Sequence, residues 1–350
     1  HTSFKWRNLA SHNAMVSVVI VGISKEAPKP RKLFSIADNT TVVMATDYIN
    51  AYLSTAKNII VDKRSKSING LLEMNFGNKP VDGGHLLLTR DEVNALGLNK
   101  QQRDRFIRQI YGSAEFIRGI NRYCIWLDDD CLEEAMQNDL IRHRVESVKT
   151  MRLASPKVAT VLMASKPHRF GELRQTGHET ITIVPSVSSE LREYLPCGLL
   201  DNKTVINNAA FAIYDAPLWN MALIASKMHL IWIATVCGRL GTGFRYSNTL
   251  GWNTFPVPFL TEKNKTDLTK SAEDILLARE AHFPATIADL YAPDKMPKNL
   301  RIAHEHNDEI LERIYIGRRF KNDTERLEKL FELYTKMTNK AVNSTVNRKI

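Results

Sequence analysis

The first apolar segment of the chain is AMVSVVIVGI, residues 14–23. An apolar run without polar alternation predicts a strand that is buried on both faces, as at the centre of an α/β sheet. A single strand cannot form a domain, so this one is expected to pair with TTVVMA at 40–45 or with strands upstream of residue 1. The Pro- and Lys-rich segment 24–32 predicts an exposed connection.

Shorter elements are predicted next. Residues 47–62, DYINAYLSTAKNIIVD, predict a helix with Asp47 as its N-cap and then a short strand. Residues 76–93 predict a loop that ends in a short strand. Thr89 and Glu92 in that segment have the spacing of a capping box, so a helix is expected to start there.

Two longer segments follow. Residues 103–127 predict a helix, a glycine turn and an aromatic strand at 122–127. Residues 132–154 predict one long amphipathic helix. Its apolar side is expected to hold Leu140, Ile141, Val145, Val148 and Leu153.

The middle of the chain is more apolar. ETITIVPSVSS at 179–189 and AAFAIYDA at 209–216 predict strands. Residues 218–240 predict a buried helix, because they are mostly apolar. Together these elements indicate a mixed α/β fold of the α+β class.

From Leu260 onward the chain is charged and its apolar positions have helical spacing. Helices are predicted at 261–282 with Thr261 as N-cap, within 286–297, at 299–316 and at 322–337. This indicates a small all-α domain at the end of the chain, followed by a polar tail that is expected to fray.

The 350 residues are 43% hydrophobic and 25% charged, which is ordinary for a globular protein. The net charge of +10 indicates a polyanionic partner such as nucleic acid. The four cysteines lack the paired spacing of a zinc site, so free thiols in a reducing cytoplasm are expected. No apolar run reaches about 18 residues, and the amino end lacks the apolar centre of a signal peptide, so no membrane association is expected.

The densest basic stretch runs from Asp139 to Arg174 and holds eight Lys or Arg residues against three acids. One interpretation is a surface that follows a phosphate backbone, and the other is a solvated helix face. The first interpretation assigns backbone contacts to Arg142, Arg144, Lys149, Arg152 and Arg169.

The segment VCGRLGTGFRYSN at 236–248 combines glycines with arginines. It does not have the pattern of a phosphate-binding loop, because no Gly-Lys-Ser/Thr follows and because it comes after a helix instead of a strand. Gly241 is expected to cap the end of that helix. What remains is a tight loop that presents Arg239 and Arg245.

Candidate catalytic residues are few. Asp128, Asp129 and Asp130 have the chemistry to hold Mg²⁺ for phosphodiester cleavage, but a solvated turn explains them as well. No nucleophile elbow or Ser-His-Asp order is present. The sequence therefore predicts neither a self-sufficient catalytic site nor a metal site.

Long stretches of the chain carry a family resemblance. They are HTSFKWRNLASHNAMVSVVIVGIS at 1–24, RLASPKVATVLMASKPHRFGELRQ at 152–175, SKMHLIWIATVCGRL at 226–240 and FRYSNTLGWNTFPVP at 244–258. With the helical end, they resemble the C-terminal part of MmeI-like (type IIL) restriction–modification proteins, and the resemblance covers essentially the whole chain. Those proteins join an endonuclease, an adenine-N6 DNA methyltransferase and a target-recognition domain in one polypeptide.

The resemblance implies four regions. They are a remnant of the methyltransferase sheet at 1–46, a mixed α/β target-recognition domain at 47–258, an all-α helical domain at 259–340 and a flexible tail at 341–350. It also implies double-stranded DNA and the remainder of the parent methyltransferase as partners, and S-adenosylmethionine as the parent's cofactor. The family's Asn-Pro-Pro-Tyr/Phe motif and glycine loop are absent here, so these 350 residues are expected to hold no cofactor and not to methylate or cut DNA alone.

The resemblance also implies base-reading residues. In the family, a GRL-x-x-x-x-RYS frame surrounds two alternate variable positions that contact a base pair, and these fall on Gly241 and Gly243. Glycine has no side chain to donate or accept, so relaxed or water-mediated readout is expected there. Arg192 is a second candidate base reader, and Arg239 and Arg245 are assigned to the DNA backbone or to the scaffold.

Other assignments have alternatives. Phe4, Trp6 and His12 are expected near the flipped base, with structural packing as the alternative. The helical end either braces the recognition domain or clamps the DNA backbone. For the chain as a whole, the alternatives are a non-catalytic docking subunit for a separate methyltransferase and a metal-dependent nuclease built on Asp128–Asp130.

Overall fold

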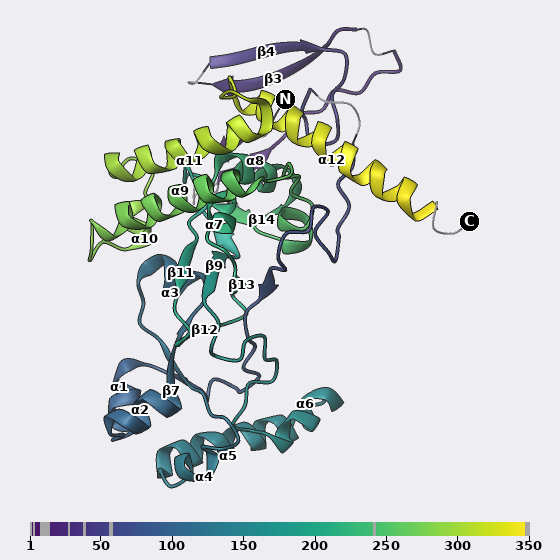
Figure 1. The fold of residues 1–350 in the computed structure, drawn as a ribbon. Coiled ribbons are helices and arrows are strands. Elements are labelled where there is room, and N and C mark those ends of the chain that lie inside the picture. Colours follow the sequence, from purple (N-terminus) through teal and green to yellow (C-terminus); the bar gives the residue numbers. More distant parts are fainter. Residues whose placement is uncertain are drawn as a thin grey trace.

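The computed structural model describes residues 2, 4–7, 15–26, 29–37, 40–55, 59–240 and 243–346. A layer of helices lies at one end of the molecule, sheets lie in the middle, and a smaller lobe with short helices lies at the other end (Figure 1). The hairpin of β3 (Arg31–Ala37) and β4 (Thr40–Thr46) extends beyond the helical layer. None of the helices in the described ranges is long and apolar enough to cross a membrane.

The amino-terminal strands form two separate ladders. β1 (Phe4–Arg7) pairs antiparallel with β2 (Met15–Val18), and β3 pairs with β4. The prediction of a strand buried on both faces at 14–23 is therefore wrong, because residues 19–23 are exposed and Ile23 is 94% exposed. The 40–45 segment pairs with its sequence neighbour instead, since a short connection closes at a smaller entropic cost than a long one.

The prediction of a helix at 47–62 is also wrong, because the described residues of this segment form bends and turns and no helix. The side-chain Oδ1 of Asn50 accepts hydrogen bonds from the backbone N–H groups of Tyr52 and Ser54. Leu53 has a positive φ of 55°. An asparagine side chain that bonds nearby backbone in this way competes with the helical hydrogen bonds.

The far lobe is built on a four-stranded sheet of order β12-β7-β8-β6. The elements of this part of the chain are β6 (Leu87–Leu88), α1 (Arg90–Ala95), α2 (Lys100–Phe106), β7 (Ile107–Tyr111), α3 (Ser113–Arg118), β8 (Tyr123–Ile125), α4 (Leu132–Ala135), α5 (Asp139–Leu153), α6 (Val158–Leu162), η1 (Met163–Ser165) and β12 (Thr204–Ile206). The capping box of Thr89 and Glu92 is confirmed at the start of α1. The aromatic strand is confirmed as β8, whereas β7 was not predicted.

The long helix predicted after this strand is two helices. Asn138 starts the second one, because its Oδ1 accepts two backbone N–H groups of the first turn of α5. Ile141 and Val145 are buried as expected. Leu140 and Leu153 are 49% and 56% exposed, so their predicted place on the apolar side is wrong.

The central sheet has the order β11-β9-β13-β5, and its two long strands are covered on both faces. Its strands are β5 (Asn75–Phe76), β9 (Ile181–Pro185), β11 (Gly198–Leu200) and β13 (Ala210–Tyr214). The strands predicted at 179–189 and 209–216 are thus confirmed. Alternate residues of a strand face opposite sides, so Val184 joins the main core while Ile183 packs toward the sheet of the far lobe.

Two apolar helices replace the single helix predicted at 218–240. They are α7 (Trp219–Ile224) and α8 (Lys227–Val236). Ser226 interrupts the run, because its side chain accepts the N–H of His229 as the N-cap of α8. α8 ends at Cys237 in an extended conformation, so the predicted helix end at Gly241 is wrong. Gly241 itself lies outside the described residues.

The carboxyl-terminal helices are α9 (Glu262–Glu280), α10 (Ile287–Leu290), α11 (Lys298–Ile316) and α12 (Asp323–Val346). Thr261 caps α9 as predicted. α12 runs past its predicted end and into the segment that was expected to fray. The helices share one core with the central sheet, since the same cluster joins Val184 to Leu268, Leu311 and Phe331.

Candidate functional site

Residues 238–240 and 243–245 form the two paired strands of a hairpin, where the sequence predicted a loop. β14 (Gly238–Leu240) pairs with β15 (Gly243–Arg245), which also pairs with β10 (Val187–Ser188). The register places Phe244 between Arg239 of β14 and Ser188 of β10. This three-stranded sheet brings together two segments that the sequence singled out separately.

Phe244 and Tyr246 anchor the hairpin in the interior. They are two residues apart, so they share one face of the strand, and both are buried. The guanidinium carbon of Arg239 lies 5.3 Å from the centre of the Phe244 ring. The Tyr246 hydroxyl lies 3.0 Å from Nε2 of His229, whose pKa is lowered to about 3 by burial. The inner face of the hairpin therefore packs through buried aromatic side chains against a neutral histidine of α8.

Gly243 and Arg245 lie on the opposite, outward face of β15. Arg245 is exposed, and no carboxylate pairs with it in the described part of the chain. A Cβ atom placed on Gly243 would lie 2.9 Å from the backbone oxygen of Ser188. A contact with backbone cannot be relieved by a side-chain rotation. The close approach of β10 to β15 therefore leaves no room for a side chain at Gly243.

Arg192 reaches the same sheet from the turn after β10. Its Nη1 donates to the hydroxyl of Ser188 at 3.2 Å, while its buried Nε has no hydrogen-bond partner. Burial lowers the pKa of this guanidinium, and no described carboxylate pairs with it. Ser188 therefore touches Arg192 with its side chain and lies against Gly243 with its backbone.

The basic stretch 139–174 is largely neutralised by acids. The ion pairs are Arg142 with Asp139, Arg144 with Glu92, and Arg169 with Asp128 and Asp129. Of the five assigned residues, Lys149 is the one that is exposed without a partner among the described residues. Counting charge along the sequence missed the acids outside the stretch, which the fold brings against it.

The assignment of Arg152 to the DNA backbone is wrong. Arg152 is 1% exposed, so it cannot reach a DNA backbone. Its guanidinium donates to five backbone carbonyl oxygens, those of Pro80, Val81, Met163, Lys166 and Arg169. Arg152 joins the loop before β6 to the segment after α6, and its role is structural.

Three family models match this chain. The model described as MmeI, target recognition domain, matches residues 55–259. The MmeI C-terminal domain matches residues 260–342, and the MmeI DNA-methyltransferase domain matches residues 1–35. The first match alone covers more than half of the chain. The chain belongs to the MmeI family.

Two longer proteins are similar to this chain over nearly all of its length. DNA methyltransferase A of Bacillus subtilis (strain 168) is 39% identical over 338 residues, which are 97% of this chain and 38% of that protein. The solved structure of the type IIL restriction-modification enzyme MmeI in complex with DNA has a TM-score of 0.84 and 32% identity, over 96% of this chain and 45% of that chain. The chain therefore spans less than half the length of either relative. Its mixed α/β domain followed by a helical domain is the architecture of that MmeI structure.

The hairpin and Arg192 fall in the MmeI recognition-domain match, and the aromatic candidates fall in the methyltransferase-domain match. The rings of Phe4 and Trp6 on β1 lie 6.2 Å apart, edge to face, and Trp6 is 56% exposed. His12 lies outside the described residues. A docking subunit for a separate methyltransferase would not be expected to match the methyltransferase domain itself, whereas residues 1–35 of this chain do.

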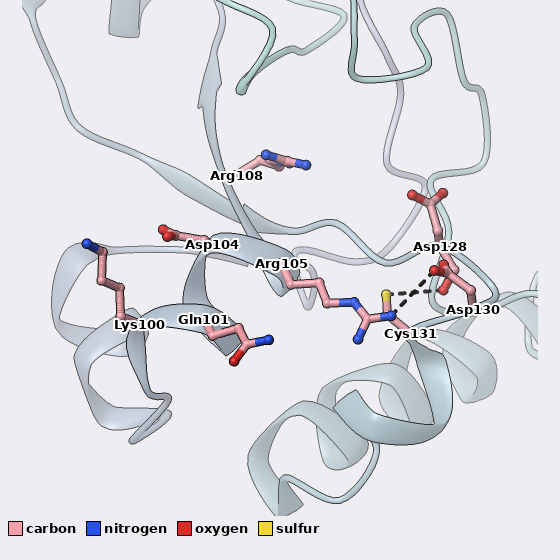
Figure 2. A pocket seen from close by; sticks show the side chains of 8 residues that line it. All are labelled: Lys100, Gln101, Asp104, Arg105, Arg108, Asp128, Asp130 and Cys131. Atoms are coloured by element: carbon pink, nitrogen blue, oxygen red, sulfur yellow. Dashed lines mark hydrogen bonds and ion pairs between the residues drawn. The ribbon is translucent and has the colours of Figure 1, made fainter.

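The acidic run Asp128–Asp130 lies at an open depression of about 700 Å³ between α2 and the turn before α4 (Figure 2). Arg105 extends from α2 across this depression and pairs with Asp130. Hydrogen bonds from three basic side chains hold the pKa of Asp129 well below its usual range. Those side chains are Lys166, His168 and Arg169. Across the described ranges, no group of three ligating side chains suits a metal ion, so the nuclease alternative finds no support in these carboxylates.

Proposed function

We propose that this chain is the sequence-reading part of an adenine-N6 DNA methyltransferase of a restriction–modification system. One observation carries the proposal. The sheet β10-β15-β14 carries Arg245 on β15 and holds Arg192 through the Ser188 hydroxyl of β10, and neither guanidinium pairs with a carboxylate in the described ranges. The recognition-domain match over 55–259 and the DNA in the related MmeI structure support the same function.

The two arginines suit different contacts with duplex DNA. Phosphate contacts position a protein on the duplex, and contacts to base edges specify the sequence. Arg245 is exposed on the outward strand face and fits a phosphate contact. Arg192 is partly desolvated, its Nε is buried, and its terminal N–H groups beyond the one bonded to Ser188 suit a contact with O6 or N7 of a guanine in the major groove.

The glycines of the hairpin leave one part of the interface without side chains. Gly243 presents only backbone to the outward face, and the approach of Ser188 blocks a larger residue. We assign relaxed or water-mediated readout to the base pair that faces this position and Gly241. Arg239, which lies over the ring of Phe244, serves as scaffold for the hairpin.

Methylation of a base inside a duplex requires the base to be flipped out of the stack, and the recognition domain holds the DNA while that happens. Phe4 and Trp6 are the candidates near the flipped base, on residues that match the methyltransferase domain. The relationship to DNA methyltransferases implies S-adenosylmethionine as methyl donor of the longer protein. The Asn-Pro-Pro-Tyr/Phe motif and the glycine loop expected for that chemistry are absent from these 350 residues, so we derive no methyl-transfer step from them.

Selection of sequences from a pool of random DNA duplexes by the chain tests this function. We expect the wild-type chain to enrich one motif and Arg192→Ala to relax a single base pair of it. Arg245→Ala should weaken binding to all sequences alike and reduce the salt dependence by about one phosphate contact. Arg313→Ala, which removes an exposed ion pair of α11, is the control and should change neither. A wild-type chain that enriches no sequence, or an Arg192→Ala variant that weakens all sequences equally, would contradict the proposal.

A further inference from the structure

The turn that carries Arg192 is partly exposed and contains short-range hydrogen bonds between its own residues. The N–H of Arg192 donates to the backbone oxygen of Ser189 at 3.3 Å, and the hydroxyl of Ser189 accepts the N–H of Leu191. Leu191 is 55% exposed. These short-range bonds define a turn, but none of them connects the turn to the helical domain.

The connection to the helical domain begins at the next residue. Both carboxylate oxygens of Glu193 accept hydrogen bonds from Nη1 of Arg301 on α11. The two side chains are each 34% exposed, so the ion pair is partly shielded from water. It crosses from the recognition-domain match to the C-terminal-domain match.

Tyr194 provides a second, fully buried anchor one residue later. Its hydroxyl donates to Oδ2 of Asp308 at 3.0 Å, and its ring stacks on His304 with centres 4.1 Å apart. Asp308 also accepts the backbone N–H of Lys227 at the start of α8. Asp308 and His304 both lie on α11, so this helix contacts two consecutive residues after Arg192.

We propose that Arg301 is a positioning residue for Arg192. α11 fixes the backbone at Glu193 and Tyr194, and this sets the direction in which the Arg192 guanidinium leaves the turn. Ser188 is the one side chain to which Arg192 donates among the described residues, so its orientation depends on the backbone that α11 holds. The inference rests on the proposed function, because it assigns the helical domain a part in base discrimination through Arg192.

The variants for the test are Arg301→Gln, Glu193→Gln and the exchanged pair Glu193→Arg with Arg301→Glu. Arg313→Gln is the matched control, because Arg313 pairs with Glu309 on the same helix and bonds to no residue of the turn in the described part of the chain. Tyr194 is left intact in every variant, so that the buried anchor still supports folding.

The first measurement does not involve DNA. Hydrogen exchange of the amides at 189–193 should become several-fold faster in Arg301→Gln and Glu193→Gln, and the exchanged pair should restore slow exchange. Amides of α9 and of the rest of α11 should keep their wild-type rates in all variants. Unchanged exchange at 189–193 would overturn the inference and leave the proposed function intact.

The second measurement is selection from random DNA duplexes, with Arg192→Ala as the reference. Arg301→Gln should relax the base pair that Arg192→Ala relaxes, on the order of tenfold, and leave the other positions of the motif unchanged. The exchanged pair should recover preference at that position. Faster exchange with an unchanged motif would overturn the positioning role, since Arg192 would then read its base without α11. If Arg192→Ala itself changes nothing, the proposed function fails and the inference fails with it.

Discussion

At the residue scale, burial separates arginines that look alike in the sequence. Arg142, Arg144 and Arg169 are each ion-paired with acids, whereas Arg152 is buried and bonded to backbone. A buried guanidinium needs its N–H groups satisfied, because an unpaired charge in the interior is costly. The five carbonyl oxygens around Arg152 meet this requirement without any carboxylate.

Replacing Arg152 and Lys149 therefore has opposite consequences. Arg152→Ala should lower the free energy of unfolding by about 3 kcal/mol or more, because several buried carbonyl oxygens lose their donor. Lys149→Ala should leave stability within about 0.5 kcal/mol of wild type. If Lys149 contacts a phosphate, its loss should reduce the salt dependence of DNA binding by about one contact. Urea titration and binding at several salt concentrations measure both effects.

A wild-type unfolding free energy in Arg152→Ala would contradict the structural role of this side chain. The assignment of Lys149 to the DNA backbone would be contradicted by an unchanged salt dependence in Lys149→Ala.

At the element scale, the hairpin β14–β15 depends on the approach of β10. Ser188 of β10 pairs with Phe244, and its backbone oxygen fills the space where a side chain of Gly243 would begin. On the other face, Phe244 and Tyr246 hold the hairpin against α8. The backbone of β15, which carries Gly243 and Arg245 outward, is therefore held by α8 on its inner face and by β10 along one edge.

Two glycines of this hairpin provide a matched comparison. Gly243→Ala should destabilise the chain by about 1–3 kcal/mol, because the new methyl group forces β10 and β15 apart. Gly238→Ala should be close to neutral, because no atom lies within 4 Å of its Cβ position. Urea unfolding of the two variants measures the difference. Equal stabilities would show that the contact with Ser188 is relieved without cost.

At the scale of the whole molecule, one core unites the recognition-domain match and the C-terminal match. It runs from β9 through α8 to α9, α11 and α12, and Trp232 of α8 contacts Phe331 and Tyr334 of α12. Buried histidines lie within this region. Burial lowers the pKa of His229 to about 3 and that of His304 well below its ordinary value. Both are neutral in the folded chain at neutral pH.

Lowering the pH should therefore destabilise the molecule. The unfolded chain takes up protons on histidine near pH 6.5, before the folded chain does, so the stability due to neutral His229 is present above that pH and is lost as the pH falls toward 3. Between pH 7 and pH 5 the loss attributable to His229 is about 2 kcal/mol. Asp308 acts in the opposite sense, since burial raises its pKa to about 6.

Comparison with His229→Gln cancels the contribution of Asp308, which both chains share. The free energy of unfolding of the wild type should fall more steeply between pH 7 and pH 5 than that of the variant. Urea titrations at four pH values, followed by tryptophan fluorescence, provide the measurement. Parallel pH profiles would contradict a neutral His229 in the folded chain.

The sequence by itself determined the class of the fold, the family, and the elements whose signals are local. The capping box at Thr89 and the short apolar runs of β9 and β13 depend on neighbours within a few residues, so they are readable along the chain. The resemblance in long stretches led to the family because those stretches preserve many residues at once. Its base-reading assignments at Gly241, Gly243 and Arg192 remain predictions.

The tertiary structure decided which charges are free and which residues meet. Glu92 neutralises Arg144 from 52 residues away, and Ser188 touches both Arg192 and β15. Residues 19–23 of the amino-terminal apolar run are exposed because burial depends on what packs against a strand, and the run's own sequence does not specify that neighbour. Charge pairing and burial act through space over a few ångströms, whereas a pattern along the chain reports only neighbours in sequence.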